Sequence, residues 1–569
     1  MEPEPRDSRE LRGADASPEQ RVQELIGEYS GPGACAADLL CDRHPAEAVA
    51  FTVVEPDLSS RDLTYGELRE GSARFAAALA ALGVEPGDGV ATLMGKSAEF
   101  LIALLGIWRR GAFHVPLFTA FAPPAIALRL KGSRAKLVVA DGDQRSKLAP
   151  SEDIPAEPPW TVIVTGAEPR DGELSFSELM EAHSADDRSA APVRLGGDGM
   201  LVQLFTSGTT GAPKAVPVPI SALASFHAYM EFGLDVQPND VYWNAADPGW
   251  AYGLYYGVLG PLATGNRNLL LHAGFSAPLT WQVMERFGVT NFAAAPTVYR
   301  ALRTVSDPAS GRVRLRRASS AGEPLTPDVV SWSEGALGVT VRDQYGQTEH
   351  GMVVVNGWHE AIRERVPPRS MGRPLPGWSC EVLMEDREEA APAGTPGRVA
   401  INVPGSPLMW FKGYVDAPEK TAERFSADRR WCFTGDAGLR DENGFYYFSS
   451  RDDDIIIMAG YRIGPFEVES VLVLDDRVAE AAVVGLPDEH TGQSLQAFVV
   501  LKPGVNGSNE LAQDLQQLVK RKFASHAYPR AVHFVSELPK TPSGKVQRYV
   551  LRERHRDRAT FAAKRTPAP

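Results

Sequence analysis

The sequence predicts an α/β fold, with a large N-terminal domain of layered α/β subdomains and a small β-rich subdomain, followed by an α+β C-terminal domain. Strand-like and helix-like segments alternate over about residues 35–141, which favours a mostly parallel sheet with helices on its faces. Short strands with Gly/Pro turns replace this alternation over about 351–448. A polar break at 449–454 precedes a second pattern of strands and helices, and 569 residues are too many for one compact core.

Apolar patterning defines the elements of the first half of the chain. Residues 65–82, rich in Ala and Leu, and residues 98–110 predict helices, and 89–93 predicts a strand between them. Residues 142–198 are rich in Pro, Asp, Glu and Ser, so we expect a surface excursion there. The apolar run 200–205 then predicts a short buried strand.

Aromatic residues gather after this strand, over 240–262. Such a cluster is core more often than pocket, because aromatic side chains bury large areas wherever they lie. Residues 268–271 and 290–296 predict two more strands of the same α/β type.

The C-terminal part has its own pattern. After the apolar run 455–458, residues 466–474 and 510–524 predict helices, and 478–484 and 497–501 predict strands. A single polar crossing joins this compact unit to the rest of the chain, as is typical of a domain boundary.

The termini and boundaries complete the organisation. Residues 1–30 are expected to be a disordered leader, because their charges alternate and no apolar core marks a signal peptide. We expect the N-terminal domain over 31–452 and the C-terminal domain over 453–569. The C-terminal tail is basic, with 13 Lys or Arg against 3 Asp or Glu from Lys520 onward. Such charge marks either a solvated helical face or a site for a phosphate-rich ligand.

Composition excludes several classes of protein. The chain has 72 acidic and 59 basic residues, a formal net charge of −13, which argues against nucleic acid or an anionic membrane as a partner. Its four cysteines lack metal-like spacing, and its apolar runs are far shorter than the roughly 20 residues of a membrane span. We expect a cytoplasmic protein with no membrane span.

A phosphate-binding loop is predicted directly after the strand over 200–205. Glycines let backbone N–H groups approach phosphate oxygens, and a lysine adds positive charge. The spacing fits neither a Walker loop nor a Rossmann turn, and a flexible turn is the alternative for this stretch taken alone. The loop contains Thr206, Ser207, Gly208, Thr209, Thr210, Gly211 and Lys214.

Four further segments follow the loop: Gly322-Glu323-Pro324, 343–349, 431–436 with Arg451, and 539–545. In this order, the five segments resemble the adenylate-forming (AMP-binding) superfamily of acyl-CoA synthetases, amino-acid-activating domains and luciferases. The resemblance covers roughly residues 40–555 and is specific, because order and spacing agree for all five segments. Residues 247–250, 345–349 and 460–464 most resemble the medium-chain acyl-CoA synthetases.

The resemblance implies an AMP-forming acid:CoA ligase. A carboxylic acid would attack the α-phosphate of ATP to give an acyl-adenylate and pyrophosphate, and the thiol of coenzyme A would then displace AMP. The implied ligands are ATP, Mg²⁺, coenzyme A and a small-molecule carboxylic acid. Both steps crowd negative charges, so catalysis would rest on positioning and charge neutralisation.

The resemblance also implies roles at the nucleotide site. The loop from Thr206 to Lys214 would hold the β- and γ-phosphates, and Tyr345 would stack on adenine beside the turn over 322–324. Glu349 would bind Mg²⁺, which prefers carboxylate and phosphate oxygens. The same segment supplies Asp343, Gln344, Gly346, Gln347 and Thr348, of which Thr348 would bond the α-phosphate.

Catalytic roles are implied for Lys545, Thr206 and Glu349. Lys545 ranks first, because it would bridge the attacking carboxylate and the α-phosphate with a mobile ammonium group. Asp436 would bind the ribose hydroxyls with help from Arg451. Outside this constellation, an ordinary surface ion pair is the alternative for Asp436, Arg451 and Glu349.

The C-terminal domain is mobile in the family, rotating between the two half-reactions. The matching hinge residue is Asp453, where a few dihedral changes can swing a domain. The thiol channel and coenzyme A site are matched by Ala459, Gly460, Tyr461, Tyr528, Pro529 and Arg530, and Arg462 matches a residue near the α-phosphate.

Acyl specificity depends on the pocket volume. In acetate-activating relatives a Trp follows the stacking Tyr and closes the acyl pocket, whereas Gly346 stands there in this sequence. We expect space for a longer acid, with Trp250 as a wall and Thr348 and Arg462 as further substrate residues. Medium-chain fatty acids are the first choice, and branched or aryl acids such as benzoate stay open.

Two other functions stay open. One is an acyl-adenylate ligase that loads the phosphopantetheine thiol of an acyl carrier protein. The other is a catalytically inactive nucleotide-binding regulator, although the retained Lys545 and Glu349 speak against it. Luciferase-like oxygenation has no positive support, and no acidic anchor for an α-amino group favours amino-acid activation.

Overall fold

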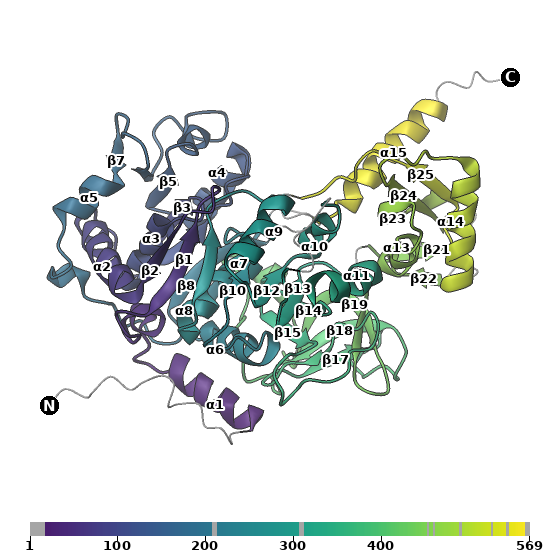
Figure 1. Cartoon of the computed structure of the whole chain (residues 1–569), viewed down its shortest axis with the longest axis horizontal. Coiled ribbons are helices and arrows are strands. Elements are labelled where there is room, and N and C mark those ends of the chain that lie inside the picture. Colours follow the sequence, from purple (N-terminus) through teal and green to yellow (C-terminus); the bar gives the residue numbers. More distant parts are fainter. Residues whose placement is uncertain are drawn as a thin grey trace.

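The computed structural model describes residues 17–206, 213–305, 312–451, 454–458, 461–488, 492–524, 527–541 and 545–563, without the side chains of 461, 462, 492 and 556–563. Four sheets organise these residues, and Figure 1 shows three of them in one large body and the fourth in a smaller body at the C-terminal end. The predicted α/β class is confirmed. No helix within these ranges is long and apolar enough to cross a membrane.

The first sheet is parallel except for its last strand. Its order is β7 (Glu173–Ser175), β6 (Thr161–Thr165), β5 (Leu137–Asp141), β3 (Gly89–Leu93), β4 (Phe113–Pro116), β8 (Met200–Thr206) and the antiparallel β9 (Lys214–Pro219). Alternate residues of a strand face opposite sides. Val90 accordingly packs with α2 (Tyr65–Ala81) and α3 (Ala98–Arg109), and Ala91 packs with α4 (Pro123–Ser133).

The second sheet has nine strands and joins distant parts of the chain. Its order is β16 (Arg373–Pro374), β15 (Gly351–Val355), β14 (Arg342–Gln347), β13 (Arg317–Ala321), β12 (Asn291–Ala294), β10 (Tyr242–Asn244), β11 (Asn268–Leu271), β1 (Val49–Val54) and β2 (Ser60–Thr64). The N-terminal strand β1 pairs in parallel with β11, so that Phe51 lies opposite Asn268. One face packs with α9 (Ala277–Arg286), α10 (Pro296–Leu302) and α11 (Pro327–Leu337).

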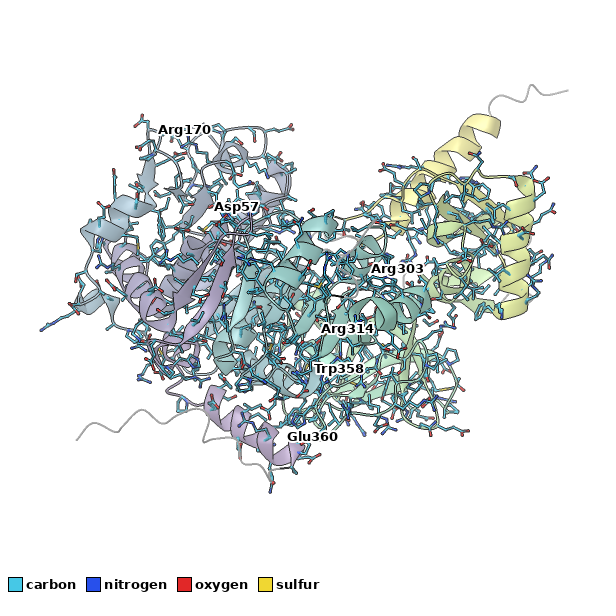
Figure 2. All side chains as sticks on the ribbon, in the orientation of Figure 1. Asp57, Arg170, Arg303, Arg314, Trp358 and Glu360 are labelled. Carbon is cyan, nitrogen blue, oxygen red and sulfur yellow. The ribbon has the colours of Figure 1, made fainter. Side chains whose placement is uncertain are left out.

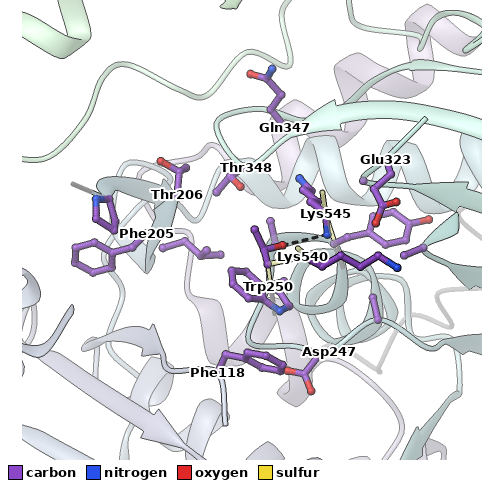
Figure 3. A pocket seen from close by; sticks show the side chains of 18 of the residues that line it. Phe118, Phe205, Thr206, Asp247, Trp250, Glu323, Gln347, Thr348, Lys540 and Lys545 are labelled. Atoms are coloured by element: carbon purple, nitrogen blue, oxygen red, sulfur yellow. Dashed lines mark hydrogen bonds between the residues drawn. The ribbon is translucent and has the colours of Figure 1, made fainter. Parts of the chain in front are cut away.

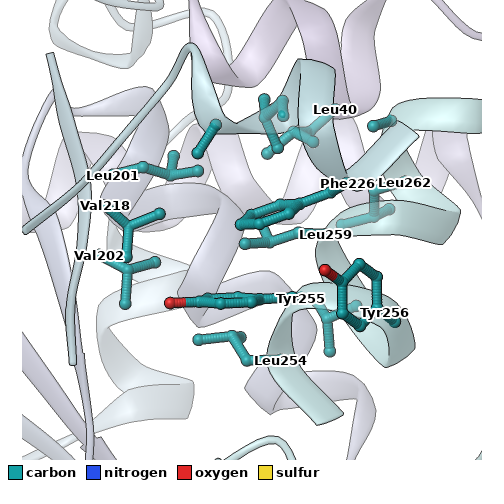
Figure 4. Packing of buried hydrophobic residues seen from close by; sticks show 14 of the residues in the cluster. Leu40, Leu201, Val202, Val218, Phe226, Leu254, Tyr255, Tyr256, Leu259 and Leu262 are labelled. Carbon is teal, nitrogen blue, oxygen red and sulfur yellow. The ribbon is translucent and has the colours of Figure 1, made fainter. Parts of the chain in front are cut away.

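An aromatic core lies between the first two sheets. Helices α6 (Ala222–Ala228), α7 (Ala251–Leu254) and α8 (Gly260–Thr264) contribute to it. The rings of Phe226 and Tyr255 stack 4.3 Å apart and face Val202 and Val218 of the first sheet (Figure 4). Most of the aromatic cluster predicted over 240–262 is therefore core, as expected.

A third, antiparallel sheet is the predicted β-rich subdomain. It consists of β17 (Cys380–Leu383), β18 (Gly397–Asn402), β19 (Trp431–Arg440) and β20 (Tyr446–Arg451), with the short α12 (Pro418–Ala422) before β19. Trp358, labelled in Figure 2, follows β15 of the second sheet, and the guanidinium carbons of Arg317 and Arg342 lie 5.0 and 3.9 Å from its ring centroid. These cation–π contacts combine apolar burial with electrostatic attraction.

The C-terminal domain has a core of its own. Strands β22 (Tyr461–Ile463), β21 (Ile456–Met458), β24 (Gly492–Leu501), β23 (Val478–Asp488) and β25 (Ala531–Phe534) form its sheet, and α13 (Pro465–Leu472), α14 (Asn509–Lys522) and α15 (Arg548–Ala563) surround it. Val468, Val483 and Leu515 are fully buried in this core. The smaller helical elements of the whole chain are η1 (Asp38–Asp42), η2 (Arg145–Leu148), α5 (Phe176–Ala182), η3 (Arg188–Ala190), η4 (Tyr229–Gly233) and η5 (Tyr255–Leu259).

Two expectations from the sequence differ from the structure. The disordered leader predicted over 1–30 is wrong for residues 18–29, which form α1 (Pro18–Tyr29) with a Ser17/Gln20 capping box. Burial of Leu25 and an ion pair between Arg21 and Glu231 dock this helix, whereas residues 1–16 lie outside the described ranges. The surface excursion predicted over 142–198 instead contributes β6 and β7 to the first sheet.

Candidate active site

A cleft of about 3160 Å³ lies between the large N-terminal domain and the C-terminal domain. Residues from all five predicted motif segments line it, and Figure 3 shows several of them facing a common space. Among its lining residues are Thr206, Lys214, Trp250, Glu323, Tyr345, Thr348, Glu349, Asp436, Arg451 and Lys545. The chain thus brings segments more than 300 residues apart to one site.

Strand pairing builds the predicted ribose end of this cleft. Asp436 on β19 and Arg451 on β20 are partners in the strand register, and Arg451 Nε lies 3.1 Å from Asp436 Oδ1. The Tyr345 hydroxyl and the Gln347 side-chain amide both donate to Asp436 Oδ2, at 2.6 Å each. Burial and the neighbouring carboxylate raise the pKa of Tyr345, so its hydroxyl stays protonated.

The predicted adenine turn lies beside an ion pair and a partly buried acid. Gly322 has a φ of 98°, a conformation that favours glycine, and Glu323 pairs with Arg300 at 2.9 Å. Burial raises the pKa of Asp343 to about 8. Its two carboxyl oxygens accept from the backbone N–H groups of Gln344 and Leu325, at 3.1 and 3.5 Å.

A second polar network forms the predicted phosphate end. The Tyr414 hydroxyl donates to Glu349 at 2.7 Å, and Arg424 lies 4.0 Å from the same carboxylate. Arg424 Nη2 also donates to Gln347 Oε1 at 2.7 Å, and Lys214 lies over the Tyr414 ring at 4.8 Å. Burial opposes ionisation of Glu349, but Arg424 and Tyr414 outweigh it and lower the pKa of this carboxyl group.

Magnesium fits this donor set only as a metal carried by a nucleotide. Glu349 is a single carboxylate, and no group of three His, Cys, Asp or Glu side chains able to hold a metal occurs in the described part of the chain. Mg²⁺ typically keeps several waters and binds through one or two carboxylates plus substrate phosphates. One protein carboxylate facing a phosphate site meets that requirement.

Thr206 and Lys214 frame the phosphate loop from both sides. They are register partners at the ends of β8 and β9, and the Thr206 hydroxyl donates to the Lys214 carbonyl at 3.4 Å. Burial and Arg424 lower the pKa of Lys214. The loop residues Ser207, Gly208, Thr209, Thr210 and Gly211 lie outside the described ranges.

Lys545 enters the cleft from the C-terminal domain. Its backbone N–H donates to Thr541 Oγ1 at 3.1 Å, and its carbonyl accepts from the Thr541 N–H at 2.7 Å. The residue is solvent-exposed, and partial desolvation by the cleft walls lowers the pKa of its ammonium group, against the opposing field of Glu323. Figure 3 shows Lys545 near Glu323 and Lys540.

Aromatic rings line the predicted acyl side. Trp250 packs against Phe118 at 5.2 Å and Phe121 at 5.4 Å between ring centroids. The Tyr255 hydroxyl donates to the Thr348 carbonyl at 3.0 Å, and this hydrogen bond holds the backbone at Thr348. Gly346 lines the cleft, and a Cβ there would lie 2.1 Å from the Gly351 carbonyl oxygen on β15, so backbone occupies the direction that a side chain would take.

The coenzyme A residues predicted in the C-terminal domain are only partly described. The channel residues Ala459 and Gly460, like the hinge residue Asp453, lie outside the described ranges, and Tyr461 and the predicted α-phosphate residue Arg462 are described as backbone of β22. The remaining predicted residues, Tyr528, Pro529 and Arg530, do not line the cleft in this arrangement. Arg530 and Lys520 instead pack on the Tyr528 ring, at 3.9 and 4.0 Å.

Three residues of the site were not predicted. Tyr414 and Arg424 come from the connection between β18 and β19, and Phe118 follows β4. None belongs to a motif with fixed spacing, so no local signal marked them. Gln344, Gln347 and Thr348, in contrast, were predicted and line the cleft.

Comparison with known proteins identifies the family. Residues 40–415 match the family model of the AMP-binding enzyme, and residues 467–545 match its C-terminal domain. The chain belongs to the AMP-binding enzyme family. The predicted resemblance to the adenylate-forming superfamily is therefore confirmed.

Relatives of this AMP-binding enzyme are acyl-CoA synthetases. It is 34% identical over 493 residues to acetyl-coenzyme A synthetase of Bacillus subtilis, covering 86% of this chain and 84% of the relative. It is 34% identical over 502 residues to mitochondrial acyl-coenzyme A synthetase ACSM3 of Rattus norvegicus, with the same coverage. A crystal structure of Brucella canis acyl-CoA synthetase is 41% identical, with a TM-score of 0.73 over 95% of this chain and 98% of that one. These matches confirm the predicted enzyme class, an AMP-forming acid:CoA ligase.

Proposed function

We propose that this AMP-binding enzyme converts a medium-chain fatty acid to its coenzyme A thioester in two steps. In the first, a carboxylate oxygen attacks the α-phosphorus of ATP, and pyrophosphate leaves with the electrons of the broken P–O bond. In the second, the thiol of coenzyme A loses its proton and attacks the acyl carbon, and AMP leaves. The observation that carries this proposal is the meeting of Lys545 with Tyr345, Glu349 and Asp436 in one cleft.

Charge neutralisation assigns each of these residues a role. Lys545 would offset the charge that develops between the attacking carboxylate and the α-phosphate, with Thr348 alongside it. Asp436, fixed by Tyr345 and Gln347, would accept hydrogen bonds from ribose. Mg²⁺ bound through Glu349 would neutralise phosphate charge, while Lys214 and Thr206 would hold the phosphates from the loop.

The proposal that the substrate is an acid with an alkyl chain rests on the aromatic residues that line one side of the cleft. The acetyl-coenzyme A synthetase and ACSM3 are equally similar to this enzyme, so overall identity does not separate short from longer acids. Trp250 and Phe118 present apolar surface there, and Phe121 packs against Trp250. Because each buried methylene contributes about 0.8 kcal/mol, such a wall favours a chain over acetate.

The two half-reactions also require different faces of the C-terminal domain. We infer an N-terminal domain up to residue 452 and a C-terminal domain from 453, with rotation at Asp453 between the steps. Separate buried cores support this division. Rotation would withdraw Lys545 and bring the segment 459–462 to the thiol channel.

ATP–pyrophosphate exchange without any thiol tests the proposal. The assay would compare acids from acetate to dodecanoate, and benzoate, in the wild type and in Trp250→Ala. We expect the exchange rate of the wild type to be highest with an acid between hexanoate and decanoate. In Trp250→Ala this maximum should move to longer acids. Trp332→Ala, a control on α11 outside the cleft, should leave it in place. A maximum at acetate or benzoate would contradict a medium-chain fatty acid as the substrate. No exchange with any acid would favour the alternative of an inactive nucleotide-binding regulator.

The acceptor thiol needs its own comparison. Supplied with the preferred acid and ATP, the enzyme should form thioester with free coenzyme A faster than with a phosphopantetheine-bearing carrier protein. The reverse preference would favour the carrier-loading alternative.

A further inference from the structure

The loop that carries Lys545 is attached to its domain at two places. Lys540 pairs with Glu480 on β23 at 2.7 Å, and Lys540 and Val546 form an antiparallel bridge across the base of the loop. The Gln547 N–H donates to the Pro539 carbonyl at 2.8 Å, which closes the base. These contacts close the base of the loop. Its second attachment is made by a residue that follows Gln547.

Arg548 makes this second attachment through a buried network. Its Nη2 lies 2.8 Å from both carboxylate oxygens of Glu469, whose Oε1 also accepts from the Val483 N–H at 2.7 Å. Its Nη1 lies 3.3 Å from Asp454, which pairs in turn with Arg552 at 3.0 Å. The side chains of Glu469 and Asp454 are each 10% exposed, and two arginines balance two carboxylates.

The same network holds one end of the connection between the domains. Asp454 is fixed to the C-terminal domain by Arg548 and Arg552, and Arg451 is fixed to the N-terminal domain by Asp436. Only residues 452 and 453 lie between these two ion-paired positions. If the domains rotate as proposed, Asp454 would move together with the loop of Lys545.

We propose that Arg548 is a positioning residue, which fixes the Lys545 loop to the residue after the domain connection so that the lysine reaches the α-phosphate in the adenylation step. This inference rests on the proposed function. A misplacement of about 1 Å in a reacting group costs roughly 100-fold in rate. The thioester step does not use Lys545, so a loosened loop should leave that step near its wild-type rate.

The experiment separates the two half-reactions in the full-length enzyme. Adenylation is followed by pyrophosphate exchange, and thioester formation by the reaction of supplied acyl-adenylate with coenzyme A. We expect Arg548→Gln to lower the first rate roughly 100-fold and to leave the second nearly unchanged. Arg548→Lys should recover part of the loss, because it keeps the charge without the two-pronged geometry.

Two further variants and a control distinguish a positioning role from a general loss of folding of the C-terminal domain. Glu469→Gln and Asp454→Asn each weaken one side of the network and should shift the ratio of the two rates in the same direction. Arg477→Gln removes an ion pair with Asp475 and Asp514 elsewhere in the domain and should leave the ratio unchanged. An equal loss of both half-reactions, or an unchanged ratio in all three network variants, would overturn the proposal.

Hydrogen exchange gives a readout independent of catalysis. The amides of Lys545 and Gln547 should exchange faster in Arg548→Gln than in the wild type or in Arg477→Gln. Unchanged exchange there would count against the positioning role even if the wild type had no ligase activity. Absence of activity in the wild type would contradict only the proposed function.

Discussion

The hydroxyl of Tyr345 lies 2.6 Å from Oδ2 of Asp436, and the two residues come from different sheets. The ring expected beside adenine is thus fixed by the carboxylate expected beside ribose. In the proposed function, recognition of the two parts of the nucleoside would be coupled through this hydrogen bond, because a shift of either residue would displace the other.

Tyr345→Phe should weaken ATP binding roughly tenfold, because it removes a hydrogen bond to a buried charged group. Calorimetric titration of ATP would measure the change. Tyr447→Phe is the matched control, since the Tyr447 hydroxyl bonds Asp441 at 3.0 Å at a position outside the cleft. Equal affinities for Tyr345→Phe and the control would contradict the coupling.

Arg424→Gln should raise the Mg²⁺ concentration needed for ATP binding roughly tenfold, because Glu349 and Gln347 both lose a charged partner. Binding of AMP without metal should change less, since Glu349 would have no role in it. Arg430→Gln removes an exposed arginine near the same connection and serves as control. An identical loss for ATP and AMP would show that Arg424 acts only through Gln347.

Asp343 should make stability depend on pH. Burial raises its pKa from 3.8 to about 8, so the folded state keeps a proton that the unfolded chain releases, and stability falls as pH rises through this interval. Asp343→Asn cannot ionise. The Tm of this variant minus that of the wild type should grow from about pH 4 to about pH 8 and then level off, whereas a constant difference would refute the assignment.

Gly346→Ala should damage adenylation with every acid instead of shortening the preferred chain. Its Cβ would meet the Gly351 carbonyl oxygen at 2.1 Å and Met352 Cα at 2.7 Å, so the β14–β15 pairing must move. We expect pyrophosphate exchange to fall roughly 100-fold with an unchanged order of acids. A shift of the maximum toward acetate at near-normal rate would restore Gly346 as the specificity residue.

Much of the fold could be predicted because its elements have strong local signals. The predicted strand over 89–93 coincides with β3, and the helix predicted over 65–82 with α2. Helix α1 does carry a local signal that the prediction missed, because the Ser17/Gln20 capping box is followed by Val22, Leu25 and Tyr29 at helical spacing. Its docking comes from tertiary contacts such as Arg21 with Glu231, which a local pattern cannot contain.

The site was predictable to the extent that its residues belong to spaced motifs. Asp436 and Glu349 carry family patterns and line the cleft as expected. Tyr414 contacts Glu349 across 65 residues of sequence, and Arg424 contacts Gln347 across 77. These supporting contacts arise when the third sheet folds against the second, so they appear only in three dimensions.

The parallel pairing of β1 with β11 has a consequence for synthesis on the ribosome. Phe51 reaches the exit well before its partner Asn268, 217 residues later, which at 5–20 residues per second is a delay of about 10–40 s. Throughout that interval the β1–β2 hairpin lacks the neighbour that buries it, and an unpaired strand edge invites association with other chains. The β1 edge of the nascent chain is therefore expected to need protection from association until translation passes β11.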